Sequence, residues 1–425
     1  MATILPFRGI RYNEYLTGDL GAVITPPYDV IKPEEQAIYY RRSPYNIIRL
    51  EYGYSGGNDS AANNRYTRAA GTWQRWLNEG VLRREEKKVF YIYEQTFTYR
   101  ENTYRRTGLV AALKAEPYDH KTVLPHEETH RKAKSDRLEL LRHCRANFSP
   151  IFGLFSDPGD VAGQIMGAVK KGAPLCDITM PEGTERHILW ALDELDLQNR
   201  LIEFMASRPV FIADGHHRYE TAVAFAGESD LRRHPGRGYV LSILVSLRDP
   251  GLVILPTHRV LSGLTPAQIA GLLRAAREKF KVTEWGSLRA ADLPSFLAEI
   301  KVRGAAAPAF GLITEEAALL LQGDFAEDTL DVSILNNRLL APLFTDMEPS
   351  AFEEHVSYSK DEYEVLEMIY RQKAQAAFLL NATPIQELTD RASRGEKMPQ
   401  KSTYFYPKLP SGLVIYDLDS SGDGP

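Results

Sequence analysis

Two histidines and an arginine follow an aspartate–glycine pair at residues 214–218, and these residue types together could bind a phosphate. The apolar run at 209–213 predicts a short buried strand, Asp-Gly predicts a tight turn, and residues 219–226 are compatible with a helix. A helix N-terminus offers backbone N–H groups and the positive end of the helix dipole. Glycine permits close approach, arginine supplies a forked cation and histidine a titratable donor. The residues expected to hold a phosphate are Gly215, His216, His217 and Arg218.

A second segment begins with His126 and Glu127 and continues into basic residues at 131, 132 and 134. A carboxylate beside positive charge stays ionised, which suits a general base acting on a hydroxyl group. The spelling His126-Glu127-x-x-His130 is also that of the zinc metallopeptidases, which need both histidines on one helix. A zinc-dependent hydrolase using these three residues is therefore an alternative, and a solvated charged loop is the plain structural explanation.

Four further residues could line the same pocket. Asp29 lies in a proline-rich extended segment, His258 and Arg259 end a predicted strand, and Lys401 begins a Lys-Ser-Thr run. That run lacks the glycines of a P-loop, so a Walker site is excluded. Each of the four also has an ordinary explanation as a turn former, a strand terminus or a lysine-protected edge strand. Motifs typical of dinucleotide-binding enzymes and α/β-hydrolases are absent from the sequence.

Composition narrows the class of protein. The 425 residues are 44% hydrophobic and 25% charged, as in soluble globular proteins. A net charge of −5 argues against a general nucleic-acid binder. Cys144 and Cys176 form no Cys-x-x-Cys pair, which excludes a cysteine zinc site or disulfide framework and predicts a reducing, cytoplasmic location. We expect no membrane partner, because no apolar run approaches a transmembrane length and no signal peptide is recognisable.

The order of elements predicts a mixed α/β (α+β) protein with several domains, since the chain is too long for one ordinary core. Predicted strands and helices are mixed throughout the chain. From residue 265 onward the predicted elements become alternating helices and strands. The expected regions are an N-terminal α/β region at 1–108, a central core at 109–262, a C-terminal α/β domain at 263–418 and a disordered tail at 419–425.

The sequence Gly215-His216-His217-Arg218-Tyr219 resembles the phosphate-binding turn of the ParB/sulfiredoxin superfamily, and its form with Asp214 is most similar to that of the free-serine kinases. Their earlier box is similar to His126-Glu127, Arg137-Leu138 with Leu141, and the run 149–152. The resemblance implies a ParB/sulfiredoxin-like core over about residues 110–250. From residue 6 to Lys408 the chain also resembles a widespread prokaryotic family without an assigned activity.

This resemblance implies a nucleotide-dependent kinase acting on a small hydroxylated metabolite, with free L-serine as the first candidate. Glu127 would take the hydroxyl proton, and His217 and Arg218 would neutralise the transferred phosphoryl group. The expected cofactors are ATP or ADP, with CTP possible, and Mg²⁺ held by Asp214. A second alternative is a nucleotide-gated module, because ParB relatives bind CTP and DNA; the acidic balance and the lack of a basic helix-turn-helix count against nucleic acid.

Overall fold

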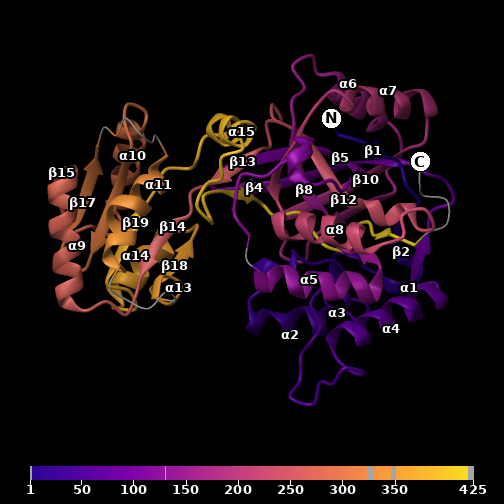
Figure 1. Ribbon diagram of the computed structural model, residues 1–425, viewed down its shortest axis with the longest axis horizontal. Coiled ribbons are helices and arrows are strands. Elements are labelled where there is room, and N and C mark those ends of the chain that lie inside the picture. The colour runs from indigo at the N-terminus through magenta and orange to yellow at the C-terminus, as the bar shows by residue number, and fades with distance from the viewer. Residues whose placement is uncertain (1, 130, 324, 326–329, 346–350, 420–425) are drawn as a thin grey trace. The chain divides into compact units, whose positions relative to one another are not determined.

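The computed structural model describes residues 2–129, 131–323, 325, 330–345 and 351–419. The chain forms two compact units, one made of residues 1–252 with 407–425 and the other of residues 253–406. The second unit is thus an insertion between two parts of the first (Figure 1). Within the described residues, no helix is both long and apolar enough to cross a membrane.

The first unit is a mixed sheet covered by helices. Its strands are β1 (Ile4–Leu5), β2 (Ile10–Tyr12), β3 (Leu82–Arg84), β4 (Phe90–Tyr99), β5 (Asn102–Lys114), β6 (Val123–Leu124), β7 (Ala146–Asn147), β8 (Ile151–Phe155), β9 (Cys176–Thr179), β10 (Glu185–Leu192), β11 (Val210–Asp214), β12 (Tyr239–Ser246) and β21 (Tyr416–Asp417). Its helices are α1 (Glu14–Thr17), η1 (Leu20–Ala22), η2 (Tyr28–Val30), α2 (Pro33–Arg42), α3 (Ile48–Glu51), α4 (Arg65–Asn78), η3 (Tyr118–His120), α5 (Arg131–Cys144), α6 (Val161–Val169), α7 (Leu195–Met205), α8 (His216–Glu228) and η4 (Pro235–Gly238).

The main sheet of this unit has nine strands in the described residues, in the order β6-β11-β8-β12-β5-β4-β10-β9, with β1 also paired to β5. Strand β12 lies at its centre, parallel to β8 and antiparallel to β5. Every residue of β12 except Ser246 is buried, because helices cover both faces of the sheet. Helix α5 packs between α8 and α4 below the strands in Figure 1, and α6 and α7 lie above them.

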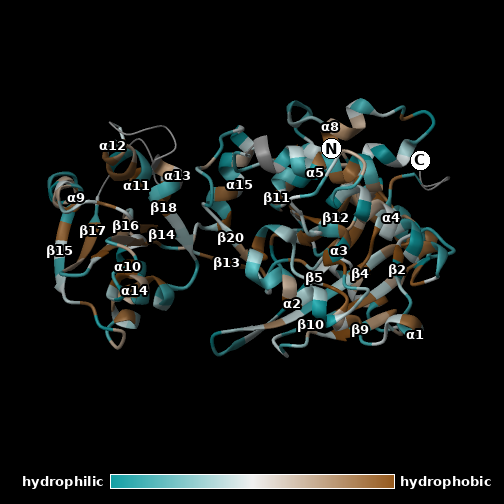
Figure 2. Cartoon of the chain, turned by 90° about the horizontal axis from the view of Figure 1, so that it is seen from below, coloured by the Kyte–Doolittle hydropathy of each residue, from teal (hydrophilic) through white to brown (hydrophobic). Residues whose placement is uncertain are grey.

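The second unit has its own antiparallel sheet, in the order β15-β17-β16-β19-β14-β18. Its strands are β13 (Val253–Leu255), β14 (His258–Leu261), β15 (Lys281–Gly286), β16 (Ala309–Thr314), β17 (Ala318–Gln322), β18 (Val356–Ser359), β19 (Ala376–Leu379) and β20 (Tyr404–Tyr406). Its helices are α9 (Pro266–Lys279), α10 (Leu293–Gly304), α11 (Asp331–Leu335), η5 (Asn336–Leu340), α12 (Ala341–Leu343), α13 (Ala351–His355), α14 (Glu362–Tyr370) and α15 (Ile385–Arg394). Figure 2 shows hydrophobic residues gathered along the strands of each unit and hydrophilic residues on the outer helices and loops.

The expected mixed α/β class is confirmed, but the structure divides the chain differently from the predicted regions. The boundary expected at residue 108 falls inside β5, which pairs with both β4 and β12. A cut at that position would split one hydrogen-bonded sheet. The expected C-terminal domain also loses residues 407–418, which belong to the first unit. Of the expected tail, only residue 419 is described, and residues 420–425 lie outside the described residues.

Candidate functional site

The predicted strand–turn–helix is present where β11 ends at Asp214 and α8 begins at His216. Gly215 caps the helix with φ 89° and ψ 28°, a left-handed conformation that a side chain would strain. A Cβ on this residue would also lie 3.1 Å from Nε of Arg218. The first backbone N–H groups of an α-helix have no acceptor within the helix, so this turn presents donors to an anion.

Arg218 points into the protein beneath this turn. Its side chain is buried, with Nη2 donating to Oδ2 of Asp214 at 2.7 Å and Nη1 donating to the carbonyl oxygen of Pro150. Burial lowers the pKa of the guanidinium, but Asp214 and Asp29 outweigh burial and raise it on balance. Nη1 and Nη2 of Arg218 thus connect α8 to the start of β8 and the end of β11. In this arrangement the two nitrogens bond to protein atoms, and they do not make the direct phosphate contact predicted for Arg218.

Asp214 is the anionic centre of the turn, and two cations share it. Arg218 binds one carboxylate oxygen and Lys408 binds the other. Burial would raise the pKa of Asp214, but Lys408 and Arg218 hold it far below its usual range. Both oxygens are occupied by these cations, so the arrangement does not fit the expected role of Asp214 as a Mg²⁺ ligand.

Lys408 is the residue of the lysine- and aromatic-rich segment that contacts Asp214, whereas the residue predicted from the sequence is Lys401 of the same segment. Lys401 belongs to the second unit, whereas Lys408 follows the return of the chain to the first. Nothing local distinguishes the two lysines, because the pairing of Lys408 with Asp214 spans 194 residues.

The predicted partner segment meets α8 through two histidines. The backbone N–H of His126 lies 3.4 Å from Nε2 of His216, and the two rings meet edge to face at 4.6 Å between centroids. Nδ1 of His126 lies 2.7 Å from the carbonyl oxygen of Ile212, so this nitrogen must carry a proton. Nε2 of His216 accepts, which places the proton of the neutral ring on Nδ1.

Glu127 lies beside the first turn of α8, with Oε2 at 3.8 Å from Nδ1 of His216. Two further contacts tie the same segment to the helix: Thr129 and Lys134 both bind Glu220, at 2.7 and 2.8 Å. The carboxylate expected to act as a base and the turn expected to hold phosphate are therefore neighbours. His217, the other residue predicted to act in catalysis, is half-buried in the same turn.

Asp29 lies within the 3-10 helix η2, and its charge acts on Arg218. The ring of the adjacent Tyr28 lies 3.8 Å below the guanidinium carbon of Arg137. Arg137 is buried and bonds to both Glu51 and Asp136, a cluster that the sequence reasoning did not select as functional. A small cavity of about 30 Å³, enough for roughly one water, lies between this cluster and Arg218.

The remaining predicted pocket residues belong to the second unit. His258 is buried, and its Nδ1 accepts from the backbone N–H of Leu380 at 3.2 Å. Arg259 donates to the carbonyl oxygens of Thr257 and Gln400. These contacts give His258 and Arg259 a structural role inside their own unit. They do not support the expectation that the two residues line the same pocket as Gly215.

The zinc hydrolase reading does not meet its structural requirement. His126 and Glu127 precede α5, which begins at Arg131, so the first histidine is not in a helix. His130 lies outside the described residues. Across the part of the chain that the structure describes, no three His, Cys, Asp or Glu side chains are arranged to hold a metal ion.

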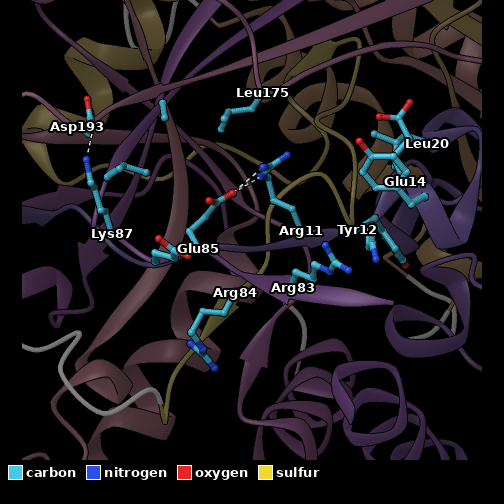
Figure 3. A pocket seen from close by; sticks show the side chains of 15 residues that line it. Arg11, Tyr12, Glu14, Leu20, Arg83, Arg84, Glu85, Lys87, Leu175 and Asp193 are labelled. Carbon is cyan, nitrogen blue, oxygen red and sulfur yellow. Dashed lines mark hydrogen bonds and ion pairs between the residues drawn. The ribbon is translucent and has the colours of Figure 1, made fainter. Parts of the chain in front are cut away.

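A larger cavity of about 530 Å³ occurs in the first unit beside β2 and β3 (Figure 3). Arg11 and Glu85 form an ion pair across it at 2.6 Å, and Lys87 and Asp193 form another at 2.9 Å. None of the residues predicted from the sequence lines this cavity. Its acidic and basic side chains neutralise each other, so it offers no selective charge to an anion.

The buried histidines predict a loss of stability in mild acid. Burial lowers the pKa of His126 to about 4 and that of His216 well below its usual range, so both stay neutral in the folded protein. Above pH 7 neither state binds the extra proton, and below about 6.5 only the unfolded chain does. For His126 alone, the free energy of unfolding should fall by about 3 kcal/mol between pH 7 and pH 4.

Urea unfolding at a series of pH values measures this dependence. His126→Asn keeps a donor for the carbonyl of Ile212 and removes the titrating ring, so it should flatten the slope. The same change at exposed His143 is the control and should leave the slope as in the wild type. Equal slopes in all three proteins would contradict the assignment of His126 as neutral.

Residues 4–375 match the model of a family described as a protein of unknown function, DUF1015. No curated protein matches the sequence. Solved structures similar to this chain include a free serine kinase variant in complex with ADP, at 14% identity and a TM-score of 0.39, covering 73% of this chain and 92% of that one.

Two other similar structures have scores in the same range. A conserved hypothetical protein from Pyrococcus furiosus is 15% identical with a TM-score of 0.37, covering 73% of this chain and 95% of that one. A truncated SbnI from Staphylococcus aureus is 11% identical with a TM-score of 0.37, covering 73% and 90%. These scores are too low to establish a shared fold.

Proposed function

The chain belongs to the DUF1015 family of proteins of unknown function, and we propose that it is a nucleotide-dependent phosphotransferase acting on a small hydroxylated metabolite. The observation that carries the proposal is the contact between two opposite features. The N-terminus of α8 favours an anion, yet Glu127 lies 3.8 Å from its first side chain. A carboxylate beside an anion site is unfavourable for binding alone, and it is what a kinase needs to deprotonate a hydroxyl.

In this function the backbone N–H groups of the first turn hold the nucleotide phosphates, and Gly215 lets them approach closely. Glu127 takes the proton from the acceptor hydroxyl as the hydroxyl oxygen attacks the terminal phosphoryl group of the nucleotide. The bond from that phosphorus to the bridging oxygen breaks, and ADP leaves from ATP, or AMP from ADP, while His217 donates a hydrogen bond to the transferred group. Neutral His216 separates the base from the phosphates. Arg218 acts indirectly, by fixing Asp214 and the turn.

The donor is ATP or ADP, with CTP as the competing nucleotide, and free L-serine is the first acceptor to test. Both oxygens of Asp214 are bound by cations, so Mg²⁺ would be held by the nucleotide phosphates, whose negative charge it would neutralise. Incubation with each nucleotide, Mg²⁺ and a panel of hydroxy amino acids and other small alcohols, followed by phosphorus NMR, tests the proposal. A phosphomonoester should appear with one acceptor, and no nucleotide consumption with any acceptor would refute the kinase.

Nucleotide binding has a separate test at the turn. Gly215→Ala should abolish the rise in melting temperature that the nucleotide gives to the wild type, because the new methyl group meets Arg218 and strains the left-handed turn. Gly227→Ala in the same helix is the matched control, since nothing lies within 4 Å of a Cβ there. It should keep the full ligand-induced shift. A shift retained in Gly215→Ala would remove the turn from the binding site.

A further inference from the structure

The segment that follows residue 406 runs past the phosphate turn, and it carries the cation that meets Asp214. Lys408 is 11% exposed at its side chain and Asp214 14%, so the ion pair between them is largely shielded from water. Asp214 also keeps its bond to Arg218 through the other oxygen. Lys408 can therefore leave the carboxylate without leaving an unpaired buried charge.

Two buried side chains fix the backbone at this point. Nη2 of Arg106 donates to the carbonyl oxygen of Pro407 at 2.7 Å, and Nε2 of Gln95 lies 3.5 Å from the carbonyl oxygen of Lys408. Arg106 also donates to Oε1 of Gln95, and Gln95 donates to Glu185 at 2.7 Å. This series of contacts connects β4, β5 and β10 to Lys408 beside the turn.

Burying the charged side chain of Arg106 at this position costs free energy. Its side chain is 1% exposed, and burial lowers its pKa to about 10, with Asp214 among the acids that oppose this shift. Its guanidinium carbon also lies 4.8 Å from the centroid of the Phe152 ring. Burying a charge costs free energy unless it is paired and hydrogen-bonded. A buried arginine that bonds to Gln95 and to the carbonyl oxygen of Pro407 therefore indicates that the position of that backbone matters.

The two cations at Asp214 differ in what they can do. Arg218 is held at both ends of its fork by Asp214 and Pro150 and has little freedom to follow a ligand. Lys408 is a compact charge on a flexible stem, with three donors that rotate freely. It is therefore the cation of this site that can move onto a phosphate and return to Asp214 afterwards.

We propose that Lys408 binds the phosphates of the nucleotide, and that Arg106 and Gln95 are positioning residues which hold it beside the turn. The inference rests on the proposed nucleotide site and replaces Arg218 by Lys408 as its direct phosphate ligand. It also predicts which part of the nucleotide depends on Lys408 for its affinity. Lys408 should contribute to the binding of ADP, and it should contribute nothing to the binding of adenosine, which has no phosphate.

Isothermal titration of ADP and adenosine against the full chain tests this division. Lys408→Met should weaken ADP binding by about 10- to 100-fold, the loss of one or two charge-assisted bonds, and leave adenosine unchanged. Lys401→Met is the matched control and should bind both like the wild type. Equal ADP affinity in Lys408→Met and the wild type would overturn the inference. A wild type that binds neither ligand would instead refute the proposed function.

The positioning role has its own readout. Arg106→Met should weaken ADP binding in the wild-type background but add little to Lys408→Met, because both changes remove the same contact. A merely structural loss would weaken ADP binding equally in both backgrounds and would overturn the role given to Arg106.

A measurement on the unmodified chain protects the inference against a variant that fails to fold. An adenosine polyphosphate carrying a pyridoxal aldehyde at its phosphate end, fixed with borohydride, should label Lys408, as peptide mass spectrometry would show. Label only at other lysines would contradict the inference.

Discussion

Glu127→Gln is expected to lower the rate of phosphoryl transfer by about 10²- to 10⁴-fold, the usual contribution of a positioned general base. Glutamine has the size of glutamate but cannot accept the proton of an acceptor hydroxyl. Oε2 of Glu127 lies 3.8 Å from Nδ1 of His216, and a glutamine side chain can occupy the same position, so nucleotide affinity should change little. Steady-state turnover and ADP titration on the same preparation separate the two effects.

The matched control is Glu228→Gln at the other end of α8. The side chain of Glu228 is 43% exposed and pairs with Arg142, which is itself 42% exposed. Replacing Glu228 by the neutral glutamine should therefore leave turnover unchanged. A Glu127→Gln protein that turns over at the wild-type rate would remove this carboxylate as the base. A parallel loss in Glu228→Gln would show that the effect comes from the charge of the helix.

Arg218→Ala is expected to destabilise the protein by about 3 to 5 kcal/mol, the usual cost of removing one partner from a buried ion pair. The guanidinium is 9% exposed, and its loss leaves the carbonyl oxygen of Pro150 without its donor and Asp214 with Lys408 alone. Arg218→Lys should recover only part of the loss, because one ammonium cannot reach both acceptors in the geometry of a fork. Urea unfolding at pH 7 measures the difference.

Arg142→Ala gives the comparison for this variant. Arg142 pairs with Glu139 and Glu228 on the surface of α5 and α8, where water screens the charges. Its removal should change stability little. If Arg218→Ala were as stable as Arg142→Ala and lost only nucleotide affinity, Arg218 would contact the nucleotide directly. That result would contradict the proposal that Lys408 replaces Arg218 as the phosphate ligand.

Local residue types predicted the parts of the site that depend on neighbours in sequence. Asp-Gly after an apolar run indicates a turn, and Gly215 indeed adopts the left-handed conformation that begins α8. Resemblance paired His126 and Glu127 with this turn, and the structure brings Glu127 to His216. Both features follow from short segments, because backbone sterics and helix termini act within a few residues.

The orientation of side chains and the contacts between residues far apart in the sequence could not be predicted in the same way. Whether Arg218 points outward to a ligand or inward depends on the carbonyl oxygen of Pro150, which another strand brings beneath the turn. The choice between Lys401 and Lys408 depends on where the chain re-enters the first unit. The ladder between β4 and β5 likewise continues through polar residues to the pair Tyr99 and Asn102, because cross-strand contacts outweigh local polarity.

The insertion of the second unit has a consequence for how the protein is made. Residues 407–419 complete the first unit through the bridges Thr25–Ser411 and Ile10–Ile415 and the pairing of β21 with β7. The ribosome adds this segment only after the whole of the second unit, so Asp214 meets Lys408 late in synthesis. Until then the nascent chain holds Asp214 without Lys408, and a polypeptide released early at residue 406 would lack that cation altogether.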